Sequence, residues 1–185
     1  LLWPDTFNNH FTPHVARAAV EVLRRLGCEI VLPERRVCCG RPLYDFGMLD
    51  LARRLLLKTL DTIGEEIERG TPVIVLEPSC AAVFRDELMN LLPDHPLAPK
   101  LRDQTFTLAE FLAMQQAERD WPKLGRDVLF HGHCHHKSVM STEADLDLLR
   151  RIAGRVDAPE SGCCGMAGSF GFKDRHYDVS VAVGE

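Results

Sequence analysis

The tripeptide Cys-Cys-Gly occurs twice in this chain, as Cys38-Cys39-Gly40 and again as Cys163-Cys164-Gly165. Adjacent cysteines are poor disulfide partners because a bond between them is strained, but their two sulfurs can reach one metal centre together. The glycine that follows lets the backbone turn sharply beside a bulky group. Repetition of this loop favours a thiol-based site over isolated buried cysteines that serve only as small apolar side chains.

Seven cysteines is a high number for 185 residues, and the chain does not start with the basic and apolar segments of a secretory signal. An odd number of cysteines without such a signal argues against a disulfide framework and for metal binding or redox work. The net charge is −5 and the arginine pairs are scattered, which argues against nucleic-acid binding. The apolar runs are too short for a transmembrane segment. We therefore expect a cytoplasmic protein, with peripheral attachment to the inner membrane face as the alternative.

The ends of the sequence do not resemble those of a complete gene product. There is no initiator Met, residues 1–3 resemble a strand that has already begun, and the last residues form no polar tail. We expect the chain to be a segment of a longer polypeptide.

Short apolar runs alternate with helical patterns along the chain. An unbroken run at 73–76 predicts a strand that is buried on both faces, and helices are expected after the caps Thr12 and Ser79. Thr107 and Glu110 form a predicted capping box. Further strands are expected at 1–3, 29–32, 127–130 and around Val156, and further helices at 47–68, 142–151 and from about 173. This alternation predicts an α/β fold with mainly parallel sheets.

The two halves of the chain resemble each other. Each runs through a strand, a helix with a double arginine near its end, a second strand, Cys-Cys-Gly and a Phe-Gly pair. An internal duplication of this kind predicts two pseudo-twofold-related α/β units. We expect a first half at 1–92, a connector with a short helix at 93–126, and a second half at 127–185 that is truncated at its C-terminus.

Two further cysteines follow predicted strands, Cys80 in the first half and Cys134 in the second. The carboxyl ends of parallel strands are where α/β folds place their sites. Cys80 would also lie at a helix N-terminus, which favours the thiolate form that binds metal. Each half then offers three thiols, while Cys28, near a helix end, is expected to be a small apolar side chain.

Histidines crowd around Cys134, at positions 131, 133, 135 and 136. Such density suggests zinc ligands or polar contacts to a cofactor, but a solvated loop that happens to be rich in histidine fits equally well. His133 and His135 are therefore the weaker metal-ligand candidates. The stronger candidates are Cys38, Cys39, Cys80, Cys134, Cys163 and Cys164.

The segments around these cysteines resemble a known family, the cysteine-rich CCG domain family. That family includes the iron–sulfur subunits of glycolate oxidase and of anaerobic glycerol-3-phosphate dehydrogenase, lactate-utilisation proteins and the B subunit of heterodisulfide reductase. The likeness covers nearly the whole chain and is closest to the C-terminal part of fused FAD-linked oxidases, in which a flavin domain and a ferredoxin-like domain come first. The matching segments are Val37-Cys38-Cys39-Gly40, Glu77-Pro78-Ser79-Cys80, His131-Gly132-His133-Cys134 and Ser161-Gly162-Cys163-Cys164-Gly165.

The resemblance implies a ligand set that this sequence supplies only in part. The family motif is an early Cys, then Cys-Cys-Gly, then Cys-x-x-Cys, once per half. In the first half, Thr6 stands at the early position and Val83 at the last one. In the second half, the cysteines that should follow Cys164 are expected past residue 185. Since a [4Fe-4S] cluster takes four thiolates, the resemblance implies a cluster in the second half of the intact protein.

The first-half site of Cys38, Cys39 and Cys80 is then expected to be degenerate, or to bind zinc with a histidine or water as the fourth ligand. The segment on its own is expected to lack the cluster.

By this resemblance the chain is expected to be an electron-transfer domain. FAD in another domain of the parent protein would oxidise a 2-hydroxy acid such as glycolate or D-lactate, and electrons would pass through iron–sulfur centres to an acceptor such as a quinone. A zinc-binding structural or docking module without a redox role is the alternative. Thiol–disulfide catalysis by the adjacent cysteines is a weaker third reading, because no Cys-x-x-Cys starts a helix. No catalytic acid or base stands out, so the segment alone is not expected to be an enzyme.

Overall fold

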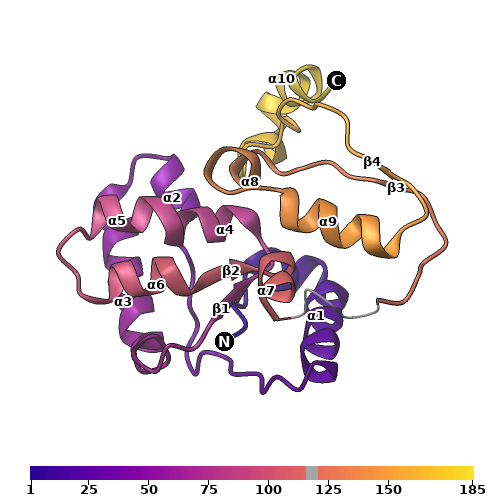
Figure 1. Ribbon diagram of the computed structural model, residues 1–185. Coiled ribbons are helices and arrows are strands. Elements are labelled where there is room, and N and C mark those ends of the chain that lie inside the picture. The colour runs from indigo at the N-terminus through magenta and orange to yellow at the C-terminus, as the bar shows by residue number, and fades with distance from the viewer. Residues whose placement is uncertain (116–120) are drawn as a thin grey trace. The chain divides into compact units, whose positions relative to one another are not determined.

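Short pairs of parallel strands lie in the two units into which the chain divides, Leu1–Phe111 (unit 1) and Leu112–Glu185 (unit 2). The computed structural model describes residues 1–115 and 121–185 (Figure 1). The predicted connector at 93–126 is therefore described only in part. Its first residues fold as part of unit 1, and residues 116–120 lie outside the described residues.

The sheet of unit 1 consists of β1 (Val73–Val75) and β2 (Thr105–Thr107), which run parallel and side by side (Figure 1). All of β1 is buried, as expected for a β-branched run that is covered on both faces. Leu2 adds a parallel bridge to Ile74, next to which the Trp3 N–H donates to the Ile74 carbonyl at 2.8 Å. The predicted strand at 73–76 is confirmed.

The helices of unit 1 pack around α3 (Leu49–Glu68), which contacts α6 (Leu97–Gln104). The buried residues of α3 recur every three or four positions, so that one face is apolar. Trp3 and Phe84 are fully buried and meet edge to face, with ring centroids 4.7 Å apart. The other helical elements are η1 (Phe7–Phe11), α1 (Pro13–Arg25), α2 (Arg41–Asp45), α4 (Pro78–Ala82), η2 (Val83–Glu87), α5 (Leu88–Leu91) and α7 (Leu108–Gln115), which continues into unit 2.

Unit 2 is built on the parallel pair β3 (Val128–Leu129) and β4 (Val156–Asp157). The Phe130 N–H donates to the Asp157 carbonyl at 2.8 Å and extends this pair by one step. Helix α9 (Glu143–Ile152) connects the two strands and buries Leu146. The other elements of unit 2 are α8 (Cys134–Val139), the short turns η3 (Phe170–Phe172) and η4 (Asp174–His176), and α10 (Tyr177–Gly184).

The observed helix starts can be compared with the predicted caps. The capping box is confirmed, because the Thr107 hydroxyl accepts the Glu110 N–H at 3.3 Å and the Glu110 carboxylate accepts the Thr107 N–H at 2.8 Å. Thr12 precedes α1 as predicted, but its hydroxyl makes no capping bond. The predicted cap at Ser79 is wrong. The Glu77 carboxylate caps α4 instead, and it accepts both the Ser79 N–H and the Ser79 hydroxyl.

The predicted strand at 29–32 is not a regular strand. Val31 accepts the Leu2 N–H at 2.9 Å, but the stretch is partly exposed and Pro33, which cannot donate to a ladder, follows it. The parallel pairing of the predicted α/β fold is confirmed. The proportion of helix is higher than predicted, because the described residues are mainly helical and form two sheets of two strands each.

Across residues 1–115 and 121–185, no helix combines the length and the apolar character that crossing a membrane requires.

Candidate functional site

The first Cys-Cys-Gly loop is held between α3 and α4 in unit 1. Gly40 has a left-handed backbone with φ of 81°, and Thr59 of α3 donates to the Cys38 carbonyl at 3.2 Å. Cys80 lies in the first turn of α4, shortly after β1. The loop and this turn bring the Cys39 and Cys80 sulfurs to 2.9 Å from each other. Both side chains are buried, with 4% and 7% of their surface exposed.

Hydrogen bonding and burial keep the Cys38 and Cys39 thiols protonated. The bond with Cys39 is the main cause that raises the pKa of Cys38, followed by burial, and the Gly40 N–H opposes the rise. For Cys39, the bond from Cys38 acts to lower the pKa, but the bond to Cys80 and burial outweigh it. The pKa of Cys39 therefore lies well above the ordinary thiol value. A metal that binds here has to displace these protons.

A buried ion pair stands directly behind the first loop. Arg41 follows Gly40 and pairs with Glu87 of η2, and 8% of each side chain is exposed. Arg41 also lies 3.4 Å from Asp45 and over the Tyr44 ring. Sequence reasoning missed this pair, because its partners lie 46 positions apart and no local pattern joins them. Because a buried charge without its partner is costly, the pair fixes the loop against η2.

The second Cys-Cys-Gly loop is packed against α10 in unit 2. Gly165 is buried with φ of 79°, and the Ser180 hydroxyl donates to its carbonyl at 2.8 Å. A β-carbon on Gly165 would collide with the Ser180 carbonyl, so this approach requires glycine. Cys163 and Cys164 are exposed, and the Cys163 sulfur accepts the Gly165 N–H at 3.4 Å. The loop therefore presents two accessible thiols on a tightly packed turn.

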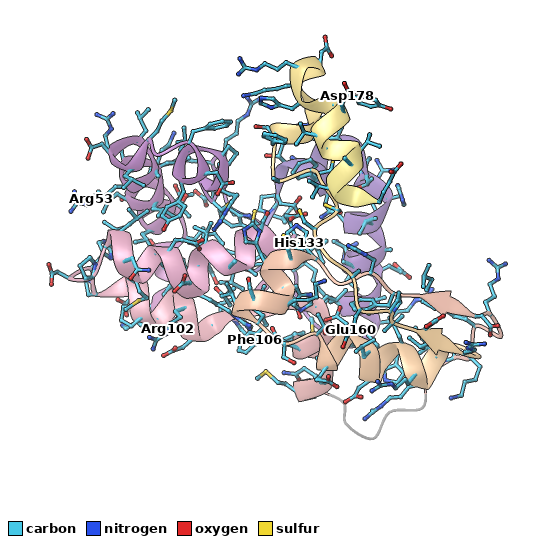
Figure 2. All side chains as sticks on the ribbon, turned by 90° about the horizontal axis from the view of Figure 1, so that it is seen from above. Arg53, Arg102, Phe106, His133, Glu160 and Asp178 are labelled. Carbon is cyan, nitrogen blue, oxygen red and sulfur yellow. The ribbon has the colours of Figure 1, made fainter. Side chains whose placement is uncertain are left out.

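Cys134 opens α8 between two histidines, one of which, His133, is labelled in Figure 2. The ligand atoms of His133, Cys134 and His135 all lie within 4.8 Å of one another, and the two imidazole rings are stacked. His133 Nδ1 accepts the His135 N–H at 3.2 Å and caps the helix. Within the described ranges, this is the one group of three or more His, Cys, Asp or Glu side chains that meets the distance limit, so neither cysteine triad meets it.

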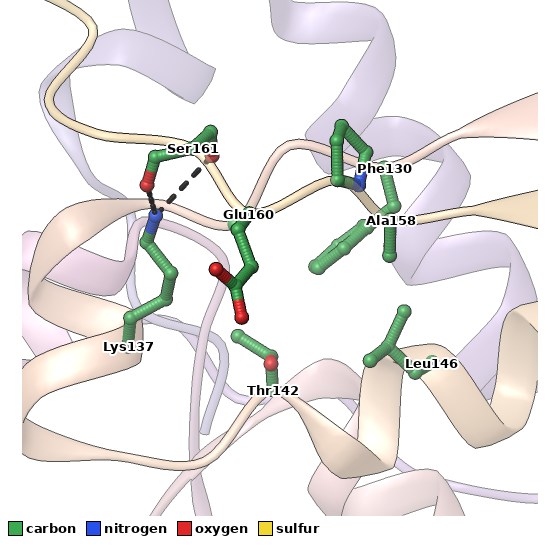
Figure 3. A pocket seen from close by; sticks show the side chains of 9 residues that line it. Phe130, Lys137, Thr142, Leu146, Ala158, Glu160 and Ser161 are labelled. Atoms are coloured by element: carbon green, nitrogen blue, oxygen red, sulfur yellow. Dashed lines mark hydrogen bonds between the residues drawn. The ribbon is translucent and has the colours of Figure 1, made fainter.

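A cavity of about 260 Å³ lies beside the segments that lead to Cys134 and Cys163 (Figure 3). Lys137 of α8 donates to the Ser161 carbonyl at 2.5 Å and to its hydroxyl at 3.3 Å. This contact ties the helix of Cys134 to the strand-to-loop segment of Cys163, and sequence reasoning missed it. The cavity is lined by Phe130, Gly132, Lys137, Thr142, Leu146, Ala158, Pro159, Glu160 and Ser161.

Three other residues that the sequence analysis named lie outside the cysteine loops. His136 is buried and its Nε2 lies 3.5 Å from an Asp145 carboxylate oxygen, whereas His131 is exposed. Cys28 is partly buried and packs against the apolar cluster that contains Leu2 and Leu23. This is the apolar role predicted for Cys28.

The sequence is similar to known proteins over most of its length. Residues 6–85 match the family model described as CCG, cysteine-rich domain. The chain is 31% identical over 172 residues to lactate utilization protein A of Bacillus licheniformis, which covers 88% of this chain and 70% of that protein. It is 32% identical over 183 residues to a subunit of the anaerobic glycerol-3-phosphate dehydrogenase of Escherichia coli strain K12, which covers 96% of this chain and 46% of that subunit. The chain thus spans about half the length of the dehydrogenase subunit. No solved structure matches it.

Proposed function

Because the chain belongs to the CCG cysteine-rich domain family, we propose that it is an iron–sulfur electron-transfer domain of an FAD-linked oxidoreductase. The proposed substrate class is a 2-hydroxy acid of the glycolate or D-lactate type. It is oxidised by a flavin domain of the same polypeptide or complex, and a ferredoxin-like domain and this one pass the electrons to an acceptor such as a quinone. The name of one relative, a lactate utilization protein, supports the 2-hydroxy acid, and the name of the other, a glycerol-3-phosphate dehydrogenase subunit, supports a redox role in general.

The observation that carries this proposal is the set of thiols in unit 2. Cys163 and Cys164 are exposed on the turn that Gly165 permits, and Cys134 opens the helix that Lys137 ties to the same segment. Iron–sulfur clusters are held by cysteine thiolates, so three free thiols are a donor set of the required chemistry. A cubane takes four thiolates, and the fourth is proposed to come from outside these 185 residues. The residues present therefore fit the group.

The residues around the proposed ligands position them. A bound cluster of this kind accepts and donates single electrons. The Ser180 hydroxyl and the Gly165 carbonyl hold the second loop on α10. The Lys137 ammonium donates to the Ser161 carbonyl, two residues before Cys163, and so joins the helix of Cys134 to the second loop.

Unit 1 is proposed to carry a degenerate version of the same site, with three cysteine ligands at Cys38, Cys39 and Cys80. It would hold zinc, with a histidine or water as the fourth ligand, or no metal. A matched backbone contact supports the proposed duplication, because the Leu2 N–H donates to Val31 in unit 1 and the Val128 N–H donates to Arg155 in unit 2. In each unit this contact precedes the Cys-Cys-Gly loop.

Anaerobic purification of the full-length protein tests the cluster. We expect a broad visible absorption that dithionite bleaches and an electron paramagnetic resonance signal in the reduced state. Cys164→Ala should remove both signals, and Cys28→Ala, which changes a thiol in an apolar cluster, should keep them. A folded wild-type protein without either signal would contradict the iron–sulfur role.

A zinc-binding structural module is the second candidate, and the start of α8 favours it. His133, Cys134 and His135 offer nitrogen and sulfur donors within 4.8 Å of one another, which are the ligand types that zinc takes. Because His133 Nδ1 already accepts the His135 N–H, His133 would bind zinc through its other ring nitrogen. One zinc per chain without iron, and its loss in both His133→Ala and Cys134→Ala, would support this module over the cluster.

A further inference from the structure

The sulfurs of Cys39 and Cys80 lie closer together than two ligands of one metal ion. Their separation is 2.9 Å, whereas two thiolates on one tetrahedral zinc ion, each about 2.3 Å from it, are roughly 3.8 Å apart. A disulfide bond is about 2.05 Å long. The observed separation falls between these two values. Since 41 positions separate the residues in the sequence, the tertiary fold creates this approach.

The surroundings of the pair favour a reaction between two sulfurs over the capture of one ion. Glu77 caps α4 through Ser79, and Glu87 pairs with Arg41, so both carboxylates have other partners. Over the described parts of the chain, no group of three or more metal-binding side chains within 4.8 Å includes Cys39 or Cys80.

Rigid elements hold the two sulfurs in position. On one side, the loop of Cys39 is anchored by the Thr59 hydroxyl on the Cys38 carbonyl and by the buried pair of Arg41 with Glu87. On the other side, Cys80 belongs to a helical turn that directly follows the buried strand β1. Folding has therefore already restricted most of the motion that disulfide formation would have to restrict. The two sulfurs have a high effective concentration for each other as a result.

We propose that Cys39 and Cys80 are a dithiol–disulfide couple, which hydrogen peroxide oxidises to an intramolecular disulfide. First, one of the two thiols loses its proton, its thiolate attacks peroxide and becomes a sulfenic acid, and the expelled hydroxide takes up that proton as one water. Second, the sulfur of the other thiol attacks the sulfenic sulfur, the S–S bond forms, and the oxygen leaves as a second water. The pair loses two electrons and two protons. A dithiol reductant restores both thiols by exchange and becomes a disulfide itself.

Cys38 is the other thiol of the first loop that could form a disulfide. Its position next to Cys39 predicts that it stays a free thiol when peroxide oxidises the pair. A disulfide between Cys38 and Cys39 would be strained because the residues are adjacent. Cys38 is only half-buried, so simple accessibility to reagent would select it before the two buried thiols. Oxidation that consumes Cys39 and Cys80 and spares Cys38 is therefore a result that exposure alone does not predict.

The couple gives unit 1 two alternative states, one with the disulfide and one with both thiols free. The disulfide joins the first loop to α4 and removes two of the three thiols that a metal at Cys38, Cys39 and Cys80 would need. The couple goes beyond the proposed cluster of unit 2 and does not depend on it.

Mass spectrometry of the folded chain tests this couple. The reduced protein is treated with hydrogen peroxide, free thiols are alkylated in denaturant, and the protein is digested with trypsin. Whatever happens at the exposed Cys163 and Cys164, we expect the Cys39 and Cys80 thiols to be lost together and a covalent link to form between peptides 37–53 and 70–85, which dithiothreitol reverses. Fragment ions of the linked wild-type peptides should place the bond at Cys39 and leave Cys38 alkylated.

Variants give the matched controls. Cys38→Ser and Cys28→Ser should keep the link, and Cys39→Ser and Cys80→Ser should each abolish it. If either of the last two fails to fold, the wild-type fragment ions decide the pairing. A bond at Cys38, no link at all, or zinc at one per chain that protects these thiols from peroxide would each overturn the couple. Because iron is measured in the same samples, loss of the couple with iron retained leaves the cluster proposal standing.

Discussion

A β-carbon on Gly165 would collide with the backbone carbonyl of Ser180, whereas the equivalent point on Gly40 keeps 3.6 Å to its nearest neighbour, a Leu55 side chain. Both glycines have φ near 80°. The two Cys-Cys-Gly loops therefore use the same backbone conformation in different surroundings, because only the second is pressed against another stretch of backbone.

This difference predicts unequal costs for the same substitution. Gly40→Ala should lower the free energy of unfolding by about 1 kcal/mol, the cost of a left-handed alanine. Gly165→Ala carries the same strain and should cost roughly 1–3 kcal/mol more, since α10 must move away from the loop. Urea unfolding measures the two free energies of unfolding, and hydrogen exchange of the native variants at 177–184 measures the displacement of α10. Equal costs for the two variants would show that α10 does not confine the second loop.

The buried pair of Arg41 and Glu87 predicts a large stability effect close to the first loop. Glu87→Gln removes the buried carboxylate that pairs with Arg41, and removal of one partner of a buried pair costs about 3–5 kcal/mol. Glu65→Gln is the matched control, because its carboxylate pairs with Arg69 in an exposed position, where such pairs contribute at most about 1 kcal/mol. Thermal unfolding of the two variants compares them. If Glu87→Gln loses no more thermal stability than the control, the buried pair does not stabilise the first loop.

The contact of Lys137 with Ser161 predicts a local effect on the second loop. Lys137→Met should raise hydrogen exchange at 162–165, because the variant loses the bond that joins α8 to this segment. Lys123→Met is a matched control in the same unit, since its ammonium also donates to a carbonyl, that of Arg151, but joins no cysteine-bearing segment. The same exchange rates at 162–165 in both variants would contradict the tether.

The protonated state of the first loop predicts how its thiols react with pH. Alkylation requires the thiolate, and the pKa values of Cys38 and Cys39 are raised above the ordinary value of 9.0 by hydrogen bonding and burial. The alkylation rate of both thiols with iodoacetamide should therefore keep rising with pH beyond about 10, where a thiol with the ordinary pKa is already mostly thiolate. At pH 7 the exposed Cys163 and Cys164 should be labelled first. If the alkylation rate of Cys38 levels off near about pH 10, as for an ordinary thiol, the hydrogen bonds and burial do not raise its pKa.

Features set by neighbouring residues were predictable from the sequence. The capping box of Thr107 and Glu110 and the buried strand at 73–76 depend on local chemistry and on an apolar run, and both were confirmed. The sequence favours Ser79 as the cap of α4, but the longer Glu77 side chain reaches past Pro78 and accepts the Ser79 N–H. The strand at 29–32 failed because Pro33 and partial exposure limit its pairing.

Contacts between distant segments were not predictable in this way. Arg41 meets Glu87 across 46 positions and Ser180 meets Gly165 across 15, and no periodicity of the sequence marks either partner. The cysteines themselves were found by repetition and resemblance, and their role as metal ligands stays a prediction. What the structure adds is that Cys163 and Cys164 lie on an exposed turn, that Cys134 is half-buried at the start of α8, and that the first triad contains a buried pair of sulfurs.

The metal content of the full-length protein, purified without oxygen, tests the central claim most directly. Iron and acid-labile sulfide should be present in comparable amounts in the wild type and in Cys39→Ser. Both should be lost in Cys164→Ala, since Cys134, Cys163 and Cys164 are the proposed cluster ligands. Stoichiometric zinc without iron in the wild type, or iron that persists in Cys164→Ala, would contradict an iron–sulfur centre in unit 2.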